Sequence, residues 1–294
     1  MCEHAQARQY VRMTSRSHTT SRRIFLGGAL LAGACATHVT GAAAASRAPG
    51  TSAAGGHRAA GGPQNYRLRP QTGAATHAPR ASAAVTYTVD APEGGEVALT
   101  FDDGPDPAHT PEVLEVLRRH RVHATFFVLG ENAEANPGLL QAIADGGHRI
   151  GNHSWSHPLL TRLSNEEARE EFVRTSELIT GAVGAPPALS RAPYGAWNEE
   201  TLAISAELGM SPLGWSVDTC DWKQPGVPQI VSTVLENVTP GAVVLSHDGG
   251  ADCSQSVTAL RHYLPRLLDS GWSPVLPPVP HSAAVRARMS PALT

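Results

Sequence analysis

The sequence predicts an α/β fold, arranged either as an open doubly wound sheet or as a closed (β/α) barrel. From residue 96 onward, short β-rich apolar runs alternate with segments of helical length. Strands that alternate with helices pair in parallel through right-handed crossovers. Five of the runs end in polar clusters, as in barrels, where functional groups gather at the carboxyl ends of the strands. The chain carries no Gly-rich dinucleotide fingerprint of either architecture.

The first half of the pattern gives three strands and three helices. We expect strands at EVALTF, ATFFVLG and HRIGNH. The first helix, TPEVLEVLRRH, begins with Thr110 as N-cap and Pro111 at the first helical position. Asn136-Pro137 opens a second helix to about residue 146. Ser164 and Glu167 form a capping box before a third helix, which ends near residue 180.

The second half continues the alternation. We expect strands at ALSRAP, PLGWSVD, GAVVLSHD and WSPVL, with helices at about 198–208, 227–237 and 254–269. The whole pattern therefore amounts to about seven strand–helix units.

The N-terminal region reads as an export signal. Arg22 and Arg23 precede a short apolar run, and Ala43-Ala44-Ala45 offers a small-residue cleavage site. The paired arginines resemble a twin-arginine signal, which predicts that residues 1–45 direct secretion or a cell-wall location. The run is too short and Gly-rich for a stable membrane span. Lipid attachment at Cys35 is an alternative that the surrounding LAGAC fits poorly.

The next segment differs in composition from the remainder of the chain. Residues 46–84 are rich in Ala, Gly, Pro and Arg and have almost no large apolar side chains, which predicts a disordered linker. We expect a catalytic domain at 85–280 and a C-terminal tail at 281–294. From residue 85, acidic side chains are about twice as many as basic ones, which argues against nucleic acid as a partner. A monomer is the default expectation.

Two of the four cysteines, Cys220 and Cys253, lie in the expected domain. A lone pair of cysteines in an exported protein predicts a disulfide, so we expect these two to be bonded.

Candidate metal ligands come from two distant motifs. Asp102 and Asp103 follow the first strand, and His153 and His157 stand four apart in GNHSWSHP. Two histidines at this spacing share one face of a helix or tight turn. Chance spacing is an alternative, since the chain has 14 histidines, and Asp-Gly-Pro is also ordinary turn sequence. With Asp103, the histidines would form a two-His, one-carboxylate site suited to Zn²⁺ or another divalent ion such as Co²⁺.

Five motifs in order, TFDDGP, HSWSH, RAPY, DTCDW and LSHD, resemble those of the NodB-homology polysaccharide deacetylases, carbohydrate esterase family 4. The resemblance covers roughly residues 95–277 and implies the family's distorted (β/α)7-type barrel. It also implies that Asp103, His153 and His157 hold the metal.

The resemblance implies further roles at the matching positions. Asp102 is the general base, and Arg191 pairs with it. The backbone N–H of Tyr194 stabilises the oxyanion. His247 is the general acid. An Asp of DTCDW orients His247, and we favour Asp221 over Asp218 for this role. Trp222 and Leu245 line the pocket for the acetyl methyl.

The activity implied is hydrolysis of acetyl groups from N-acetylglucosamine glycans, either peptidoglycan or chitin and its oligosaccharides. Acetylxylan is a competing substrate, because the family also includes O-deacetylases. A carbohydrate-binding relative that has lost turnover is the alternative from another class, and the presence of Asp102 and His247 favours the enzyme.

Overall fold

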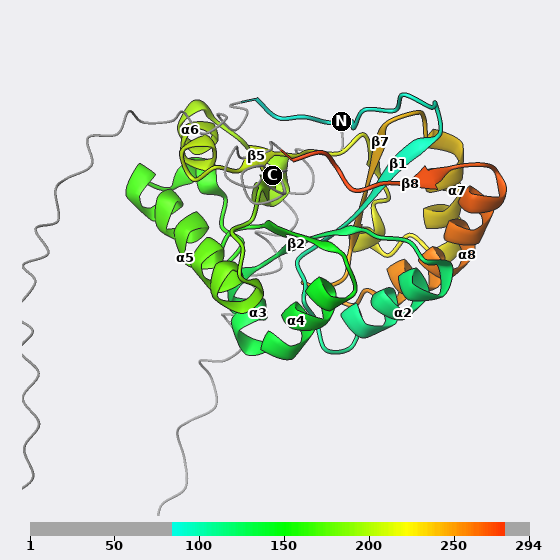
Figure 1. Cartoon of the computed structure of the whole chain (residues 1–294), viewed down its shortest axis with the longest axis horizontal. Coiled ribbons are helices and arrows are strands. Elements are labelled where there is room, and N and C mark those ends of the chain that lie inside the picture. Colours follow the sequence, from blue (N-terminus) through cyan, green and yellow to red (C-terminus); the bar gives the residue numbers. More distant parts are fainter. Residues whose placement is uncertain (1–83, 280–294) are drawn as a thin grey trace, which may run out of the picture. The chain divides into compact units, whose positions relative to one another are not determined.

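The computed structural model describes residues 84–279 (Figure 1). The predicted export signal, all of the predicted linker except its last residue, and the predicted tail lie outside this range. Within it, no helix combines the length and apolar character that crossing a membrane requires.

Eight short strands form a single sheet in which every pair of named strands is parallel. The order is β5-β4-β3-β2-β1-β7-β6, with β8 paired to β1. The strands are β1 (Glu96–Asp102), β2 (Thr125–Val128), β3 (Arg149–Asn152), β4 (Leu189–Ser190), β5 (Ser211–Pro212), β6 (Val217–Asp218), β7 (Ala242–His247) and β8 (Ser273–Pro274). The ladder ends at β5 on one side and β6 on the other, so the fold is a curled, open version of the expected barrel.

The central strand, β1, aligns the two halves of the sheet. Its pairing with β7 runs from Val97 to Asp102 and sets Asp102 beside His247. Along its other edge, β8 pairs with the first two residues and β2 with the last three. All seven β1 side chains are buried, which fixes the register of the strand that carries the first motif.

The segment at 86–89 links the β5 end of the sheet with β7. Thr86 forms a bridge with Leu213, just after β5, and Thr88 forms one with Ala242 at the start of β7. The N–H of Val89 donates to the carbonyl of Gly241 at 2.8 Å. This segment therefore joins strands that do not pair with each other.

The chain forms seven α-helices within residues 84–279 (Figure 1). They are α2 (Thr110–His120), α3 (Gly130–Ala135), α4 (Pro137–Asp145), α5 (Asn165–Val183), α6 (Glu199–Glu207), α7 (Val227–Asn237) and α8 (Ser254–Asp269). The largest core cluster combines β1, β2 and β7 side chains with residues of α2, α7 and α8. This core supports the strand ends on which the five motifs lie.

The local predictions had mixed outcomes. The capping box of Ser164 and Glu167 is confirmed at the start of α5. The N-cap prediction for Thr110 is wrong, because His109 occupies that position. The Thr110 hydroxyl instead donates to Asp248 Oδ2 at 2.6 Å and accepts the N–H of Asp106. The Thr110 hydroxyl therefore binds a buried carboxylate and does not cap the N-terminus of its own helix.

Two element boundaries also differ from the sequence prediction. PLGWSVD is not one strand: β5 pairs with β4, whereas β6 pairs with β7. The intervening residues, 213–216, carry the chain across the open side of the sheet. The helix α3 was not predicted, because its GENAEA sequence directly continues an apolar strand.

Candidate active site and metal centre

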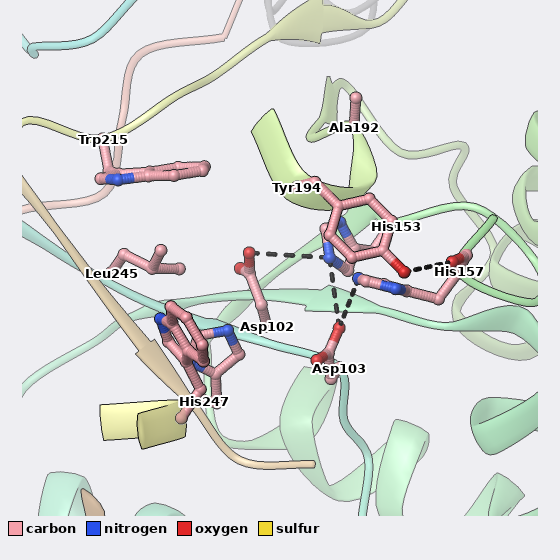
Figure 2. A pocket seen from close by; sticks show the side chains of 10 residues that line it. Asp102, Asp103, His153, His157, Ala192, Tyr194, Trp215, Leu245 and His247 are labelled. Atoms are coloured by element: carbon pink, nitrogen blue, oxygen red, sulfur yellow. Dashed lines mark hydrogen bonds and ion pairs between the residues drawn. The ribbon is translucent and has the colours of Figure 1, made fainter. Parts of the chain in front are cut away.

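The motif side chains converge on one small pocket at the carboxyl ends of β1, β3 and β7 (Figure 2). Its volume is about 30 Å³. A volume of about 10–15 Å³ on this measure holds one water, so the pocket suits only a small group. Its lining comprises Asp102, Asp103, His153, His157, Ala192, Tyr194, Trp215, Trp222, Leu245 and His247.

Three of these residues form a candidate metal centre. Asp103 Oδ1 lies 3.2 Å from His153 Nε2 and 3.3 Å from His157 Nε2 (Figure 2). One ligand atom from each residue lies within 4.8 Å of the others. The structure thus brings together the three residues proposed from the sequence, although 50 or more positions separate Asp103 from the histidines.

The donor set fits a divalent cation. Asp103 Oδ1 is buried and accepts no hydrogen bond within the described chain. The ring atom His153 Nδ1 lies 2.8 Å from the carbonyl of Arg191, so it carries the proton and leaves Nε2 as a lone-pair donor. A carboxylate and two imidazoles are ligands that Zn²⁺ accepts in catalytic sites.

Burial and neighbouring charge set the protonation of this cluster. Burial acts to raise the pKa of Asp103, but the imidazoles of His157 and His153 outweigh it and hold that pKa well below its ordinary value. Burial lowers the pKa of His157 to about 4, which keeps its ring neutral near pH 7. Burial opposes charge on His153 too, yet the carboxylates of Asp102 and Asp103 raise its pKa overall. A cation would displace that proton on binding.

The backbone is unusual where it presents these groups. Asp103, Ser154, His157 and Tyr194 have positive φ values, of 69°, 71°, 59° and 63°. Such conformations cost free energy in residues with a Cβ and cluster at functional sites. The turns after β1, β3 and β4 are therefore shaped by the surrounding structure rather than by local preference.

A buried ion pair stands beside the ligands. Arg191 Nη1 donates to Asp102 Oδ1 at 2.7 Å and to Thr100 Oγ1 at 2.9 Å. Its other nitrogens donate to the carbonyls of Leu213 and Gly214. The guanidinium is fully buried with these partners, so it holds Asp102 in one orientation facing the pocket.

A second buried pair lies at the end of β7. His247 Nδ1 is 2.7 Å from Asp221 Oδ1, and Asp221 Oδ2 accepts the N–H of His247 and the hydroxyl of Ser256. Burial disfavours the charged ring, but the adjacent Asp221 carboxylate raises the pKa of His247 to about 10. Asp218 instead accepts the N–H of Cys220 at 2.8 Å. The structure therefore sets Asp221, rather than Asp218, against the imidazole.

The remaining predicted residues line the pocket as apolar walls. Tyr194 packs edge-on against the His157 ring at 4.7 Å, and its hydroxyl donates to the His157 carbonyl. Leu245 lies to the left of Asp102 in Figure 2, and Trp222 also lines the pocket. Trp215 was not assigned to the site from the sequence, and Figure 2 shows it across the pocket from Tyr194. Its aromatic ring was a signal, but other tryptophans of the chain share it, so it did not single out this residue.

The disulfide prediction is wrong for this structure, in which Cys220 and Cys253 are thiols. The sulfur of Cys253 donates to the carbonyls of Gly249 and Ala251. The Lys223 ammonium lies 3.7 Å from the sulfur of Cys220. Each sulfur is thus engaged by its own local turn.

Comparison with known proteins accords with this geometry. A family profile described as polysaccharide deacetylase matches residues 90–213. The peptidoglycan-N-acetylglucosamine deacetylase of Bacillus cereus is 44% identical over 177 residues, which are 60% of this chain and 64% of that protein. The chitooligosaccharide deacetylase of Bradyrhizobium sp. is 44% identical over 188 residues, which cover 86% of its length.

The chain belongs to the polysaccharide deacetylase family. Solved polysaccharide deacetylases share its fold. A family 4 carbohydrate esterase from Streptomyces lividans, solved with acetate, is 35% identical with a TM-score of 0.58, over 62% of this chain and 92% of that one. A family 4 pseudoenzyme from Bacillus anthracis is 31% identical with a TM-score of 0.61, over 65% and 66%. Because the family includes a pseudoenzyme, activity has to be argued from the residues of this chain.

Proposed function

We propose that this chain is an exported, metal-dependent hydrolase that removes acetyl groups from N-acetylglucosamine-containing glycans, either peptidoglycan or chitin-type chains. One observation carries the proposal. Two buried pairs, Asp102–Arg191 and His247–Asp221, face a pocket of about 30 Å³ that also presents three candidate metal ligands. Amide hydrolysis needs a base for the water and an acid for the leaving nitrogen, and the two pairs supply one of each.

Each side chain has a defined part in the reaction. Asp102, held by Arg191, accepts a proton from the attacking water. His247, kept protonated by Asp221, donates a proton to the departing nitrogen. The backbone N–H of Tyr194 binds the oxyanion, and Trp222 and Leu245 enclose the acetyl methyl. A divalent cation held by Asp103, His153 and His157 would polarise the acyl oxygen and lower the pKa of water to about 7.

The substrate proposal rests on the names of the relatives. Several are peptidoglycan or chitooligosaccharide deacetylases, which act on N-acetylated sugars. The paired arginines at 22–23 support export by a twin-arginine signal, which would bring the enzyme to cell-wall glycans. Zn²⁺ or Co²⁺ is the proposed ion and a monomer the proposed state.

The test is acetate release by the purified chain from N-acetylated chito-oligomers, peptidoglycan and acetylxylan. Metal content is measured on the same sample, with and without chelator. We expect release from an N-acetylated glycan that chelator abolishes and Zn²⁺ or Co²⁺ restores. Release from acetylxylan alone would make the chain an O-acetyl esterase. Tight glycan binding with no release from any substrate would make it a non-catalytic relative.

A further inference from the structure

Two of the three candidate ligands, His153 and His157, share one short loop after β3. Ser154 and His157 within it both have positive φ. Five residues with two such conformations are a poor match for an isolated peptide. Contacts with other elements are therefore needed to hold the loop in the conformation that points both imidazoles at one ion.

The main fastening point is the side chain of Glu171 on α5. Its Oε2 accepts the N–H of Trp155 and the N–H of Ser156, both at 2.8 Å. Its Oε1 accepts the Ser156 hydroxyl, also at 2.8 Å. One half-buried carboxylate thus binds both residues that lie directly before His157.

Other contacts hold the Trp155 side chain in the same place. The guanidinium of Arg174, one turn along α5, lies 3.7 Å from the centre of the Trp155 ring. On α3, a Cβ at Gly130 would meet the same ring at 2.2 Å, so the indole fills the space beside that glycine. The indole is therefore packed between α3 and α5.

We infer that Glu171 is a positioning residue for the metal centre: by accepting three hydrogen bonds from the Trp155–Ser156 turn, it sets the His157 imidazole relative to Asp103 and His153. The inference rests on the metal site of the proposed function. Partners behind the ligands of a metal typically change its affinity about 10- to 100-fold when removed.

Substitutions at position 171 can distinguish the hydrogen bonds of the side chain from its charge. Glutamine at position 171 would keep a carbonyl oxygen for both N–H donors, and the Ser156 hydroxyl can turn to accept from the amide. Alanine would remove all three of these hydrogen bonds from the loop. Glu170, the exposed neighbour on α5, supplies a matched control, since it has the same side chain and is not part of the fastening.

The experiment measures Zn²⁺ affinity of the metal-free full chain by competition with a chromophoric chelator. Four variants are compared with the parent: Glu171→Ala, Glu171→Gln, Glu170→Ala and Ser156→Ala. We expect about 10- to 100-fold weaker binding for Glu171→Ala and a smaller loss for Ser156→Ala. Glu171→Gln and Glu170→Ala should stay close to the parent.

Thermal unfolding with and without Zn²⁺ excludes a merely structural role. A ligand that binds the folded chain stabilises it more, at a given concentration, the tighter it binds, so Glu171→Ala should show a smaller rise in Tm with Zn²⁺ as well as any loss without it. If Glu171→Ala does not fold, weaker Zn²⁺ binding by Ser156→Ala supports the inference, and parental affinity in that variant contradicts it.

The outcomes distinguish this inference from the function on which it rests. If the parent binds Zn²⁺ and Glu171→Ala binds it equally well, Glu171 has no positioning role and the proposed function stands. If the parent binds no divalent cation, the proposed function and this inference fail together.

Discussion

The two halves of the pocket satisfy their polar atoms in opposite ways. On the acid–base side, Arg191 donates to four oxygens and Asp221 accepts four hydrogen bonds. On the ligand side, Asp103 Oδ1 is buried without a hydrogen bond, and two imidazole nitrogens point at it. A buried polar atom without a partner is costly unless something binds there. The groups proposed to move protons are thus hydrogen-bonded within the protein, whereas the proposed ligand atom Asp103 Oδ1 has no such bond among the described residues.

The largest effect should follow from removing a ligand. His157→Ala leaves two of the three donors, so we expect the bound metal to be lost and acetate release to fall to the level of the chelated parent. Metal content and turnover measured on one sample check this. His262→Ala, an exposed histidine on α8, serves as control and should keep both. Full metal content in His157→Ala would remove this residue from the ligand set.

The next largest effect is expected at Asp102, and it tests whether this carboxylate differs in role from the candidate ligand Asp103. Asp102→Asn keeps the size of the side chain and an oxygen for Arg191 but cannot take a proton. We expect turnover to fall by about 10²- to 10⁴-fold while metal content stays at the parental level. Loss of metal together with activity would show that Asp102 belongs with the ligands and would erase the contrast between the two halves.

At the other pair, the expected effect depends on the substrate. His247→Ala removes the proton donor for the leaving group, so hydrolysis of an N-acetyl glycan should fall by about 10²- to 10⁴-fold. Hydrolysis of 4-nitrophenyl acetate should fall much less, because nitrophenolate leaves without a proton. Rates on both substrates, measured on one preparation, check this. An equal loss on both would assign His247 a role other than proton donation.

The smallest effect concerns the pH range. Asp221 raises the pKa of His247 from the ordinary 6.5 to about 10, so the parent should keep a protonated ring across neutral pH. In Asp221→Asn, the alkaline limb of the pH–rate profile should move to lower pH. The matched change Asp218→Asn should leave the limb in place, because asparagine retains an oxygen for the Cys220 N–H. An unmoved limb in Asp221→Asn would contradict the assignment.

The raised pKa of His247 also makes the stability of the fold depend on pH. A group whose pKa is raised by folding stabilises the protein fully below its unfolded pKa, and that contribution is lost as pH rises through the folded pKa. The free energy of unfolding of the parent should therefore decline between about pH 6.5 and 10 because of His247. Asp221→Asn should show a flatter profile over the same range, measured by denaturant titration.

The sequence predicted those features that depend on strand ends and motif order. The parallel α/β fold and the convergence of Asp103, His153 and His157 follow from strand–helix alternation, because carboxyl ends of parallel strands meet at one edge. Features that depend on partners far away in the sequence could not be predicted from it. Thr110 does not cap its helix because its hydroxyl binds Asp248, which lies 138 residues away. Glu171 belongs to none of the five motifs, and its role appears only when α5 packs beside the β3 loop.

The bridging segment at 86–89 has a consequence for the order of folding. It is the first part of the described chain to be synthesised, yet its partners, Pro212 to Gly214 and Gly241 to Ala242, come more than 100 residues later. Contacts between such distant positions form slowly, because a long loop has to close before they contribute. Amide hydrogens of this segment should therefore become protected during refolding well after those of β2, whose partners on β1 and β3 lie about 25 residues away.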